Sequence, residues 1–343
     1  MKRLLCLLLM LCLLLAGCAG TRPALDTDAT AGEKLNVHFI DVGQADCILL
    51  ECAGRYMLID GGNVEDSSLV VSYLQKQGVK DLSLVVCSHA HEDHVGGLSG
   101  VLAVYPTAKV WAPTKTYSSK CFDDFVYYTD QQGLDITIPK PGDSFDLAKA
   151  QVTVLGPVTS YAETNNTSIV LMVQFGENRF LFTGDAEKDA ETDMLEHGAK
   201  VKADVLKVGH HGSDTSTGYR FLYEVDPAYA VISVGADNTY GHPHEEPMSR
   251  LRDANVTVYR TDKMGTIVAT SDGKNITFSW EKGNAAPEDS TGSAAEYYIG
   301  NVNSRVLHIP SCSGLPAEKN QILFRSIDAA ITAGYTPCSR CMT

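Results

Sequence analysis

Four side chains of metal-binding types occur within six positions of the chain, directly after an apolar segment. They are His89, His91, Asp93 and His94. Residues 82–87 predict a buried strand, and open α/β sheets place their chemistry at the C-terminal ends of such strands. His89 and His91 can share one metal from an extended loop, and Asp93 and His94 can reach a second. Imidazole with carboxylate suits Zn, Mn or Fe. The alternative is a polar loop whose histidines carry no metal.

Length and charge limit the classes of protein to consider. The 343 residues suffice for one large domain and a small one, and an apolar content of 44% describes a globular protein. The formal charge is −14, from 42 acidic and 28 basic residues. Such a surface repels a nucleic acid backbone at long range, so any contact with DNA must be local or metal-mediated.

The first 34 residues predict export rather than part of the fold. Lys2 and Arg3 precede an apolar run over residues 4–15, which is too short to span a membrane. Residues 15–18 resemble a bacterial lipobox, which implies a signal peptide over residues 1–17 and a lipid on Cys18 at the extracytoplasmic face of the cell membrane. An ordinary signal peptide cut nearby is the alternative. Residues 18–34 are small and polar and predict a tether.

The elements around the histidine-rich segment resemble a known fold. Residues 37–50 predict two strands, 56–62 a third and 67–77 a helix, ahead of the strand that leads to His89. This order and the pattern His-x-His-x-Asp-His are similar to the opening half of a metallo-β-lactamase-fold hydrolase. The motif Asp-Val-Gly-Gln-Ala-Asp at residues 41–46 is similar to the hydrolase domain of ComEC-type competence proteins. The resemblance implies an α/β protein with an αββα sandwich over residues 35–282.

Two later strands end on further candidate ligands. Residues 180–182 lead to Asp185, and the resemblance implies that this carboxylate bridges the two metals. An anion is needed there because cations roughly 3.5–4 Å apart repel each other. Residues 205–208 lead to His210 and His211. Aligning the Gly-His-Gly turn of the superfamily favours His211 as the ligand, with His210 facing substrate, although the reverse assignment stays open.

Three further positions are candidates for substrate contact. Most of the superfamily has a histidine near Asn165 and Asn166, whereas the ComEC-type branch has Asn-Asn-x-Ser, as here. The metal of His89 and His91 then lacks a third imidazole, and one of the asparagines can supply a weak oxygen ligand or bind substrate. His242 is a candidate proton donor or phosphate contact. The segment 117–130 predicts either a flap over the site or a surface helix or loop.

The end of the chain carries a second, separate pattern. Residues 283–294 have the composition of a flexible linker. Two ligand pairs with zinc-site spacing follow within residues 295–343: His308, Cys312, Cys338 and Cys341. The segment resembles the zinc domain of the Ada DNA-repair protein, with His308 in place of its first cysteine. Four protein ligands imply one structural Zn. A disulfide, for instance between Cys338 and Cys341, is the alternative.

These patterns support one leading hypothesis for function. The chain is predicted to be an exported, lipid-anchored hydrolase of phosphodiesters, with DNA as a candidate substrate. Two divalent metals, Zn or Mn, would lower the pKa of bound water toward ~7 and clamp phosphoryl oxygens. The residues assigned to catalysis are Asp93, His210, His242 and Asn166. The alternatives are a phosphoesterase for small envelope molecules such as phosphocholine esters, and a surface DNA-binding accessory without activity.

Overall fold

The computed structural model describes residues 32–288, 298–310, 312–324 and 326–342. The predicted signal peptide, Cys18 and nearly all of the tether lie outside the described residues. Within the described ranges, no helix has the length and apolar character needed to cross a membrane.

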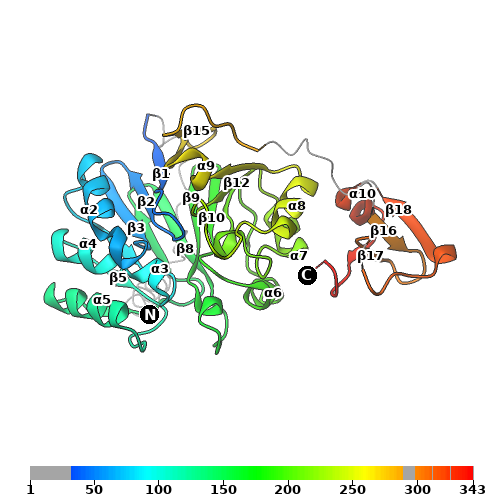
Figure 1. The fold of residues 1–343 in the computed structure, drawn as a ribbon, viewed down its shortest axis with the longest axis horizontal. Helices are drawn as coiled ribbons and strands as arrows, with labels where there is room; N and C mark the ends of the chain where they lie inside the picture. Colours follow the sequence, from blue (N-terminus) through cyan, green and yellow to red (C-terminus); the bar gives the residue numbers. More distant parts are fainter. Residues whose placement is uncertain (1–31, 289–297, 311, 325, 343) are drawn as a thin grey trace, which may run out of the picture.

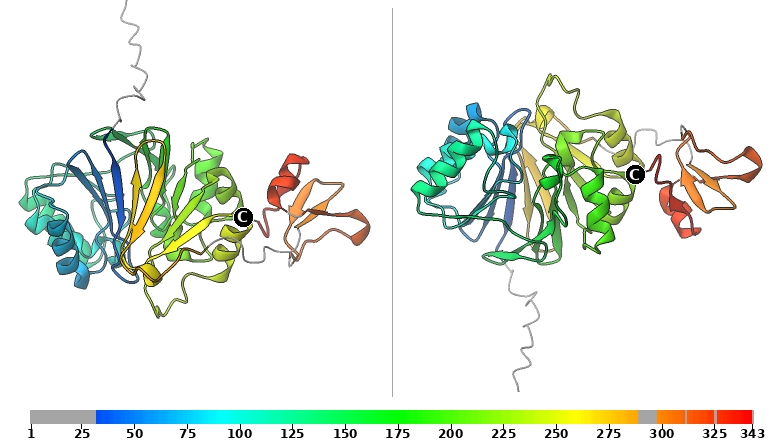
Figure 2. Two further views of the ribbon diagram at one scale, coloured as in Figure 1. Left: turned by 90° about the horizontal axis from the view of Figure 1, so that it is seen from above. Right: turned by 90° about the horizontal axis from the view of Figure 1, so that it is seen from below.

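Two mixed β-sheets pack face to face in the middle of the larger domain (Figures 1 and 2). The first sheet has the order β15 (Ile276–Trp280), β14 (Ile267–Ser271), β1 (Leu35–Phe39), β2 (Ile48–Cys52), β3 (Arg55–Ile59), β4 (Leu84–Val86), β5 (Val110–Trp111) and β6 (Ile136–Thr137). The second has the order β13 (Thr257–Arg260), β12 (Tyr229–Ile232), β11 (Val205–Lys207), β10 (Asn178–Phe182), β9 (Val170–Phe175), β8 (Ala150–Gly156) and β7 (Ser144–Leu147). Phe39 and Leu50 of one sheet and Val173 and Phe180 of the other belong to the core between them.

Helices cover the outer face of each sheet (Figure 1). The first sheet carries α2 (Ser67–Lys76), α4 (Leu98–Val104) and α5 (Lys120–Gln131), and the second carries α6 (Lys188–Glu196), α7 (Tyr219–Val225) and α8 (Glu245–Asp253). The predicted α/β class and αββα sandwich are confirmed. Most of the segment 117–130 is a surface helix, because α5 buries Phe122 and Phe125 against the helices beside it. Tyr117 ahead of the helix does reach the site, since its ring centroid lies 6.4 Å from that of His91. A short helix, α9 (Thr261–Met264), follows β13.

The strand directions bring the candidate ligands to one edge of the sandwich. β4 runs parallel to β3 and β5, and β11 runs parallel to β10 and β12. The carboxyl ends of parallel strands meet at the same edge of a sheet, so the segments after β10 and β11 lie together. The segment after β4, in the other sheet, faces them, because His89 and His94 contact Asp185. The short helices at this edge are η2 (Val64–Asp66), α3 (Glu92–Val95), η3 (Asn165–Thr167) and η4 (Gly209–Gly212).

In its described residues, the C-terminal module is a small separate sheet with one α-helix and one short 3-10 helix. Its strand order is β18 (Gln321–Phe324), β16 (Tyr298–Asn301), β17 (Val306–His308) and β19 (Thr336–Pro337), and its helices are η5 (Glu318–Asn320) and α10 (Ile327–Thr332). Tyr219, the first residue of α7, packs into the module's core beside Tyr298 and Tyr335. The described part of the predicted linker is tied to the larger domain, because the backbone of Glu288 pairs with that of Val258. Residues 289–297 lie outside the described ranges.

Candidate metal centre

The segment after β4 places the first four candidate ligands around a tight backbone crossing. His91 stands at the N-terminus of α3, and His94 lies within that helix and is fully buried. The helix sits close to the turn after β3, since a Cβ atom on Gly97 would lie 1.9 Å from the carbonyl oxygen of Gly61. Glycine at this position therefore allows α3 to reach the sheet edge.

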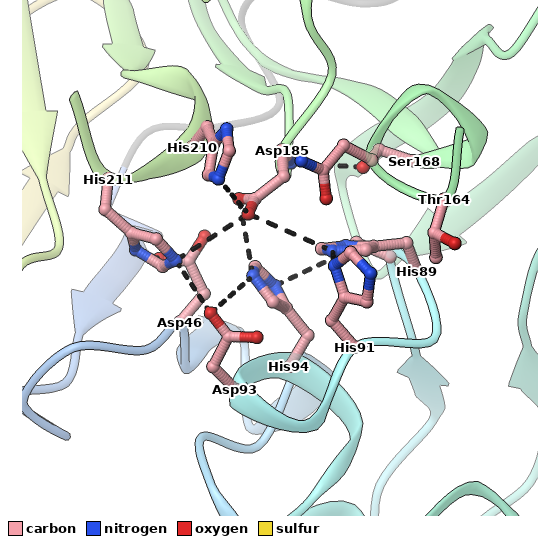
Figure 3. A network of polar contacts seen from close by, with 12 residues as sticks. Asp46, His89, His91, Asp93, His94, Thr164, Ser168, Asp185, His210 and His211 are labelled. Atoms are coloured by element: carbon pink, nitrogen blue, oxygen red, sulfur yellow. Dashed lines mark hydrogen bonds and ion pairs between the residues drawn. The ribbon is translucent and has the colours of Figure 1, made fainter. Parts of the chain in front are cut away.

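Asp185 lies at the centre of the converging side chains (Figure 3). It is 1% exposed, and its backbone N–H donates to Ser168 Oγ at 3.0 Å. Its Oδ1 lies 3.3 Å from His94 Nε2, and its Oδ2 lies 3.9 Å from His89 Nε2. The carboxylate thus faces imidazoles on two sides, and the predicted ligands from β4 and β10 come together.

The two adjacent histidines after β11 face different surroundings. Both histidines lie within η4 and have positive φ, 49° for His210 and 53° for His211, which non-glycine residues rarely adopt. His211 is buried; its Nδ1 lies 3.0 Å from the carbonyl oxygen of Ser233, while Nε2 lies 3.2 Å from Asp93 Oδ2. A ring whose Nδ1–H donates to a carbonyl presents Nε2 as a ligand atom. His210 is partly exposed, and its Nδ1 lies 3.3 Å from Glu187 Oε1.

Buried side chains that sequence reasoning missed hold these ligands in place. Asp60 accepts hydrogen bonds from the backbone N–H and the hydroxyl of Ser88, both at 2.7 Å, and lies 2.8 Å from His94 Nδ1. Asp46 pairs with Lys207 Nζ at 2.9 Å and lies 3.4 Å from His211 Nδ1. Burial opposes ionisation of Asp46, but Lys207 and His211 outweigh it and hold its pKa below the usual range. Their positions in the sequence could have indicated these residues. Asp60 directly follows β3 and Lys207 is the last residue of β11, and both strands lead to the site.

Lys207→Met is expected to destabilise the metal-free protein by about 3–5 kcal/mol, because it leaves the Asp46 carboxylate buried without its cation. Urea unfolding measures the change. Lys202→Met is the matched control, since it breaks an exposed ion pair with Asp226 and should cost less than about 1 kcal/mol. The double variant Lys207→Met/Asp46→Asn should recover part of the loss. Equal losses from Lys207→Met and Lys202→Met would contradict the structural role of the buried pair.

The donor set fits divalent cations. Four side chains offer one ligand atom each within 4.8 Å of one another: Asp93, His94, Asp185 and His211. His94 Nε2 and Asp185 Oδ1 are buried without a hydrogen-bond partner. Burial lowers the pKa of His94, but Asp185, Asp93 and Asp60 outweigh it and hold that pKa well above the usual range. The pocket therefore favours positive charge at this point, as a metal site requires.

The second predicted ligand pair lies on the other side of Asp185. His89 Nε2 and His91 Nδ1 are 3.0 Å apart, so both rings face one point. Asn166 is buried, and its Oδ1 accepts the backbone N–H of Glu187 at 2.9 Å, which stabilises the turn after Asp185. Asn165 Oδ1 is buried and has no partner. Of the two asparagines, Asn165 is thus the one with a vacant acceptor.

His242 stands beside the His210–His211 pair. Its ring centroid lies 5.5 Å from that of His210 and 6.5 Å from that of His211. The amide of Gln44 accepts from Gly235 N through Oε1, so its Nε2 donates to His242 Nδ1 at 3.3 Å. Burial, with the neighbouring histidines, lowers the pKa of His242 to about 4. The ring is neutral at pH 7, with the proton on Nε2.

Buried polar groups outside the centre fix the loop that follows the ligand histidines. Both carboxylate oxygens of Glu191 accept backbone N–H groups, from Thr217 at 2.5 Å and from Gly218 at 2.9 Å. Arg250 donates to the carbonyl oxygens of Ser216 and Thr217 at 3.0 and 3.2 Å. The loop between η4 and α7 is therefore held from α6 and from α8.

Glu191 is expected to make folding less favourable as pH rises. Burial raises the pKa of this carboxyl to about 7 from its ordinary value of 4.5, against the opposing effect of the two backbone N–H groups. The folded state then binds the proton more tightly than the unfolded state. The resulting stabilisation is complete below pH 4.5 and is lost as pH rises through about 7.

The Glu191→Gln variant isolates this contribution because it cannot titrate. Between about pH 5 and about pH 8, the free energy of unfolding should shift in favour of the variant by roughly 2–3 kcal/mol. Urea unfolding of both proteins across this pH range measures the difference. A difference that stays constant with pH would show that Glu191 has an ordinary pKa.

The C-terminal module brings its four predicted ligands together. His308, Cys312, Cys338 and Cys341 offer ligand atoms that all lie within 4.8 Å of one another. His308 Nδ1 lies 3.3 Å from Cys312 Sγ and 3.9 Å from Cys341 Sγ. All three cysteines are free thiols here, as are Cys47 and Cys87, which are buried. Histidine with three thiolates is a zinc-type donor set.

Known protein families and relatives match both parts of the chain. A family described as the metallo-beta-lactamase superfamily matches residues 40–236, and one described as the metal binding domain of Ada matches residues 284–343. ComE operon protein 3 of Bacillus subtilis (strain 168) is 32% identical over 250 residues, which cover 67% of this chain and 32% of that protein. Competence protein ComA of Neisseria gonorrhoeae is 30% identical over 257 residues, which cover 74% of this chain and 34% of that protein.

The chain spans about a third of the length of these two curated relatives. Among solved structures, the metallo-beta-lactamase fold protein YhfI from Bacillus subtilis covers 70% of this chain and 100% of its own, with a TM-score of 0.48 and 14% identity. The resemblances to the metallo-β-lactamase superfamily and to the zinc domain of Ada are confirmed by the family matches, and the resemblance to competence proteins is confirmed by the two relatives.

Proposed function

Since the chain belongs to the metallo-beta-lactamase superfamily, we propose that it is a metal-dependent phosphodiesterase and that DNA is its first candidate substrate. The observation that carries the proposal is the position of Asp185, buried between two groups of imidazoles at the carboxyl edge of both sheets. A carboxylate shared between two ligand groups is the arrangement that two cations near a phosphoryl group require.

The ligands fall into two sets that share Asp185. One set is Asp93, His94, Asp185 and His211, and the other is His89, His91 and Asp185. When bound, two divalent cations, Zn or Mn, would activate a water molecule and neutralise phosphoryl oxygens. The asymmetry of the sets follows from Asn165 and Asn166, which stand where most of the superfamily has a further histidine.

The remaining side chains orient the water and the substrate. The Asp93 side chain is 31% exposed, so its carboxylate can face both a ligand position and solvent, and it can accept a proton from an attacking water. His242, neutral and protonated on Nε2, can donate a hydrogen bond to a phosphoryl oxygen. His210, whose side chain is partly exposed, has its Nε2 3.7 Å from Asp185 Oδ2. Asn166 supports the turn after Asp185 through its bond to Glu187.

Two observations bear on the substrate in opposite directions. The matched relatives carry names from bacterial competence, which favours DNA. The net charge of −14 favours a small phosphoester over a polyanion, because long-range repulsion weakens the approach of a nucleic acid. A small envelope phosphoester, for instance one that carries choline, is therefore the second candidate.

Incubation of the purified protein with linear single-stranded and double-stranded DNA, with Mn²⁺ and with Zn²⁺ separately, tests the proposal. Metal-dependent degradation that Asp185→Asn abolishes would support a nuclease. Intact DNA, together with hydrolysis of a small phosphodiester such as bis(p-nitrophenyl) phosphate, would favour the second candidate. If metal-loaded protein catalyses neither reaction, the proposal of phosphodiester hydrolysis is refuted.

We further propose that the protein is exported and anchored by a lipid on Cys18. The support is the lipobox-like sequence, which lies outside the described residues. Metabolic labelling with palmitate should mark the wild type and not Cys18→Ser. Equal labelling of both would exclude an anchor at this cysteine.

A further inference from the structure

A groove opens beside the metal centre, at the side of Asp93. Its volume is about 610 Å³, within the range of small-molecule sites, roughly 300–1,000 Å³. The lining residues are Gln44, Asn63, Val64, Glu65, Glu92, Asp93 and Tyr240. Since Asp93 is a proposed ligand, any substrate with its scissile phosphate at the metal centre places a neighbouring group in this groove.

Tyr240 presents an aromatic face to solvent at one wall of the groove. Its side chain is 68% exposed, whereas His242 beneath it is only partly accessible. The two rings are stacked, with centroids 5.6 Å apart and an interplanar angle of 25°. A solitary exposed tyrosine is ordinary on a protein surface. A tyrosine stacked on a histidine that borders the ligand residues offers its free face to whatever enters the groove.

The loop that carries Tyr240 is held in one conformation. Asn238 donates to the carbonyl oxygens of Gly235 and His242 at 3.0 and 2.6 Å and accepts from His242 N at 3.0 Å. His244 accepts the N–H of Asp214 at Nδ1, so its Nε2–H donates to the carbonyl oxygen of Tyr240 at 3.1 Å. A ring on a pre-organised loop loses little entropy when it stacks on a ligand.

The charges of the groove decide what kind of group fits. Glu65, Glu92 and Asp93 contribute three carboxylates, and the described lining residues include no lysine or arginine. A phosphate in the groove would therefore be repelled, whereas an uncharged ring would not. Gln44 already uses both ends of its amide on Gly235 and His242, which leaves ring stacking as the main contact.

We propose that this groove is a nucleoside subsite, in which Tyr240 stacks on the base of the nucleotide next to the scissile phosphate. The inference rests on the proposed phosphodiesterase function and narrows its substrate to nucleic acid with unpaired bases. A base within a duplex cannot offer its face to an exposed ring without leaving the stack. Because stacking is tolerant of base identity, the subsite selects single strands without reading sequence.

A pair of oligonucleotides with the same phosphates tests the subsite. One is oligothymidylate, and the other is an oligomer of equal length in which every nucleotide is an abasic tetrahydrofuran. The wild type should cleave oligothymidylate with a kcat/KM about 5- to 100-fold higher. Tyr240→Ala should reduce this ratio to near one, and Tyr240→Phe should retain it. Fluorescence anisotropy measured without divalent metal compares the binding affinities of the two oligomers while neither is cleaved.

Tyr127→Ala is the matched control, because Tyr127 is also exposed, at 55%, but lies on α5 outside the groove lining. It should keep the wild-type ratio. Equal cleavage of the two oligomers by the wild type would overturn the subsite while phosphodiester hydrolysis stands. Hydrolysis of bis(p-nitrophenyl) phosphate with neither oligomer cleaved would also overturn it. Failure on all three substrates would refute the proposed function itself.

Discussion

Asp185→Asn is expected to lower metal-dependent phosphodiester hydrolysis by about 10³-fold or more. Loss of a group that merely orients a metal ligand costs about 10–100-fold in affinity or activity. Loss of a carboxylate that faces both ligand sets should lower activity further. Asparagine keeps the shape of the side chain but removes its charge. It also turns an amide toward His94 or toward His89, where a carboxylate oxygen now stands.

Metal content and turnover should fall together in this variant. Elemental analysis of the purified protein and initial rates at saturating Mn²⁺ measure the two quantities. Asp189→Asn is the matched control, since it removes an exposed carboxylate four residues further along the chain, in the first turn of α6. It should keep both values. Wild-type turnover from Asp185→Asn with full metal content would refute the bridging role.

The candidate ligands were predictable because each has a metal-binding side chain and follows an apolar segment. His89 comes after β4, Asp185 after β10 and His211 after β11, and parallel strands deliver their carboxyl ends to one edge. The sandwich itself needed the family resemblance, because no local pattern specifies that β7 and β13 close opposite edges of one sheet.

The supporting polar groups were not predictable from spacing. Lys207 belongs to a strand that is otherwise apolar, and its partner Asp46 lies in the loop between β1 and β2 of the other sheet, so the packing of the two sheets brings the pair together. Glu191 lies in a helix rich in charged residues, where a solvated side chain is the ordinary expectation. It is buried because the loop after His211 passes over α6 and directs two backbone N–H groups at its carboxylate.

Cys338→Ser is expected to unfold the C-terminal module while the larger domain stays folded. The module's described core is small, and structural zinc in comparable domains contributes about 10–16 kcal/mol of apparent binding energy at neutral pH. Removal of one thiolate from the cluster leaves Cys312, Cys341 and His308 as an incomplete set. The larger domain has its own cores between and outside its two sheets, so it does not depend on this zinc.

Hydrogen exchange and zinc analysis measure the effect of Cys338→Ser. Amides of residues 298–342 should lose protection, amides of β10 should keep it, and zinc content should fall by one equivalent. Cys121→Ser is the matched control, because it removes a partly exposed thiol of α5 that is no part of the cluster. The Cys338→Ser variant also distinguishes a zinc site from the alternative of a disulfide between Cys338 and Cys341. If Cys338 and Cys341 were joined, zinc content would not change and Cys341 would newly react with iodoacetamide, as mass spectrometry would show.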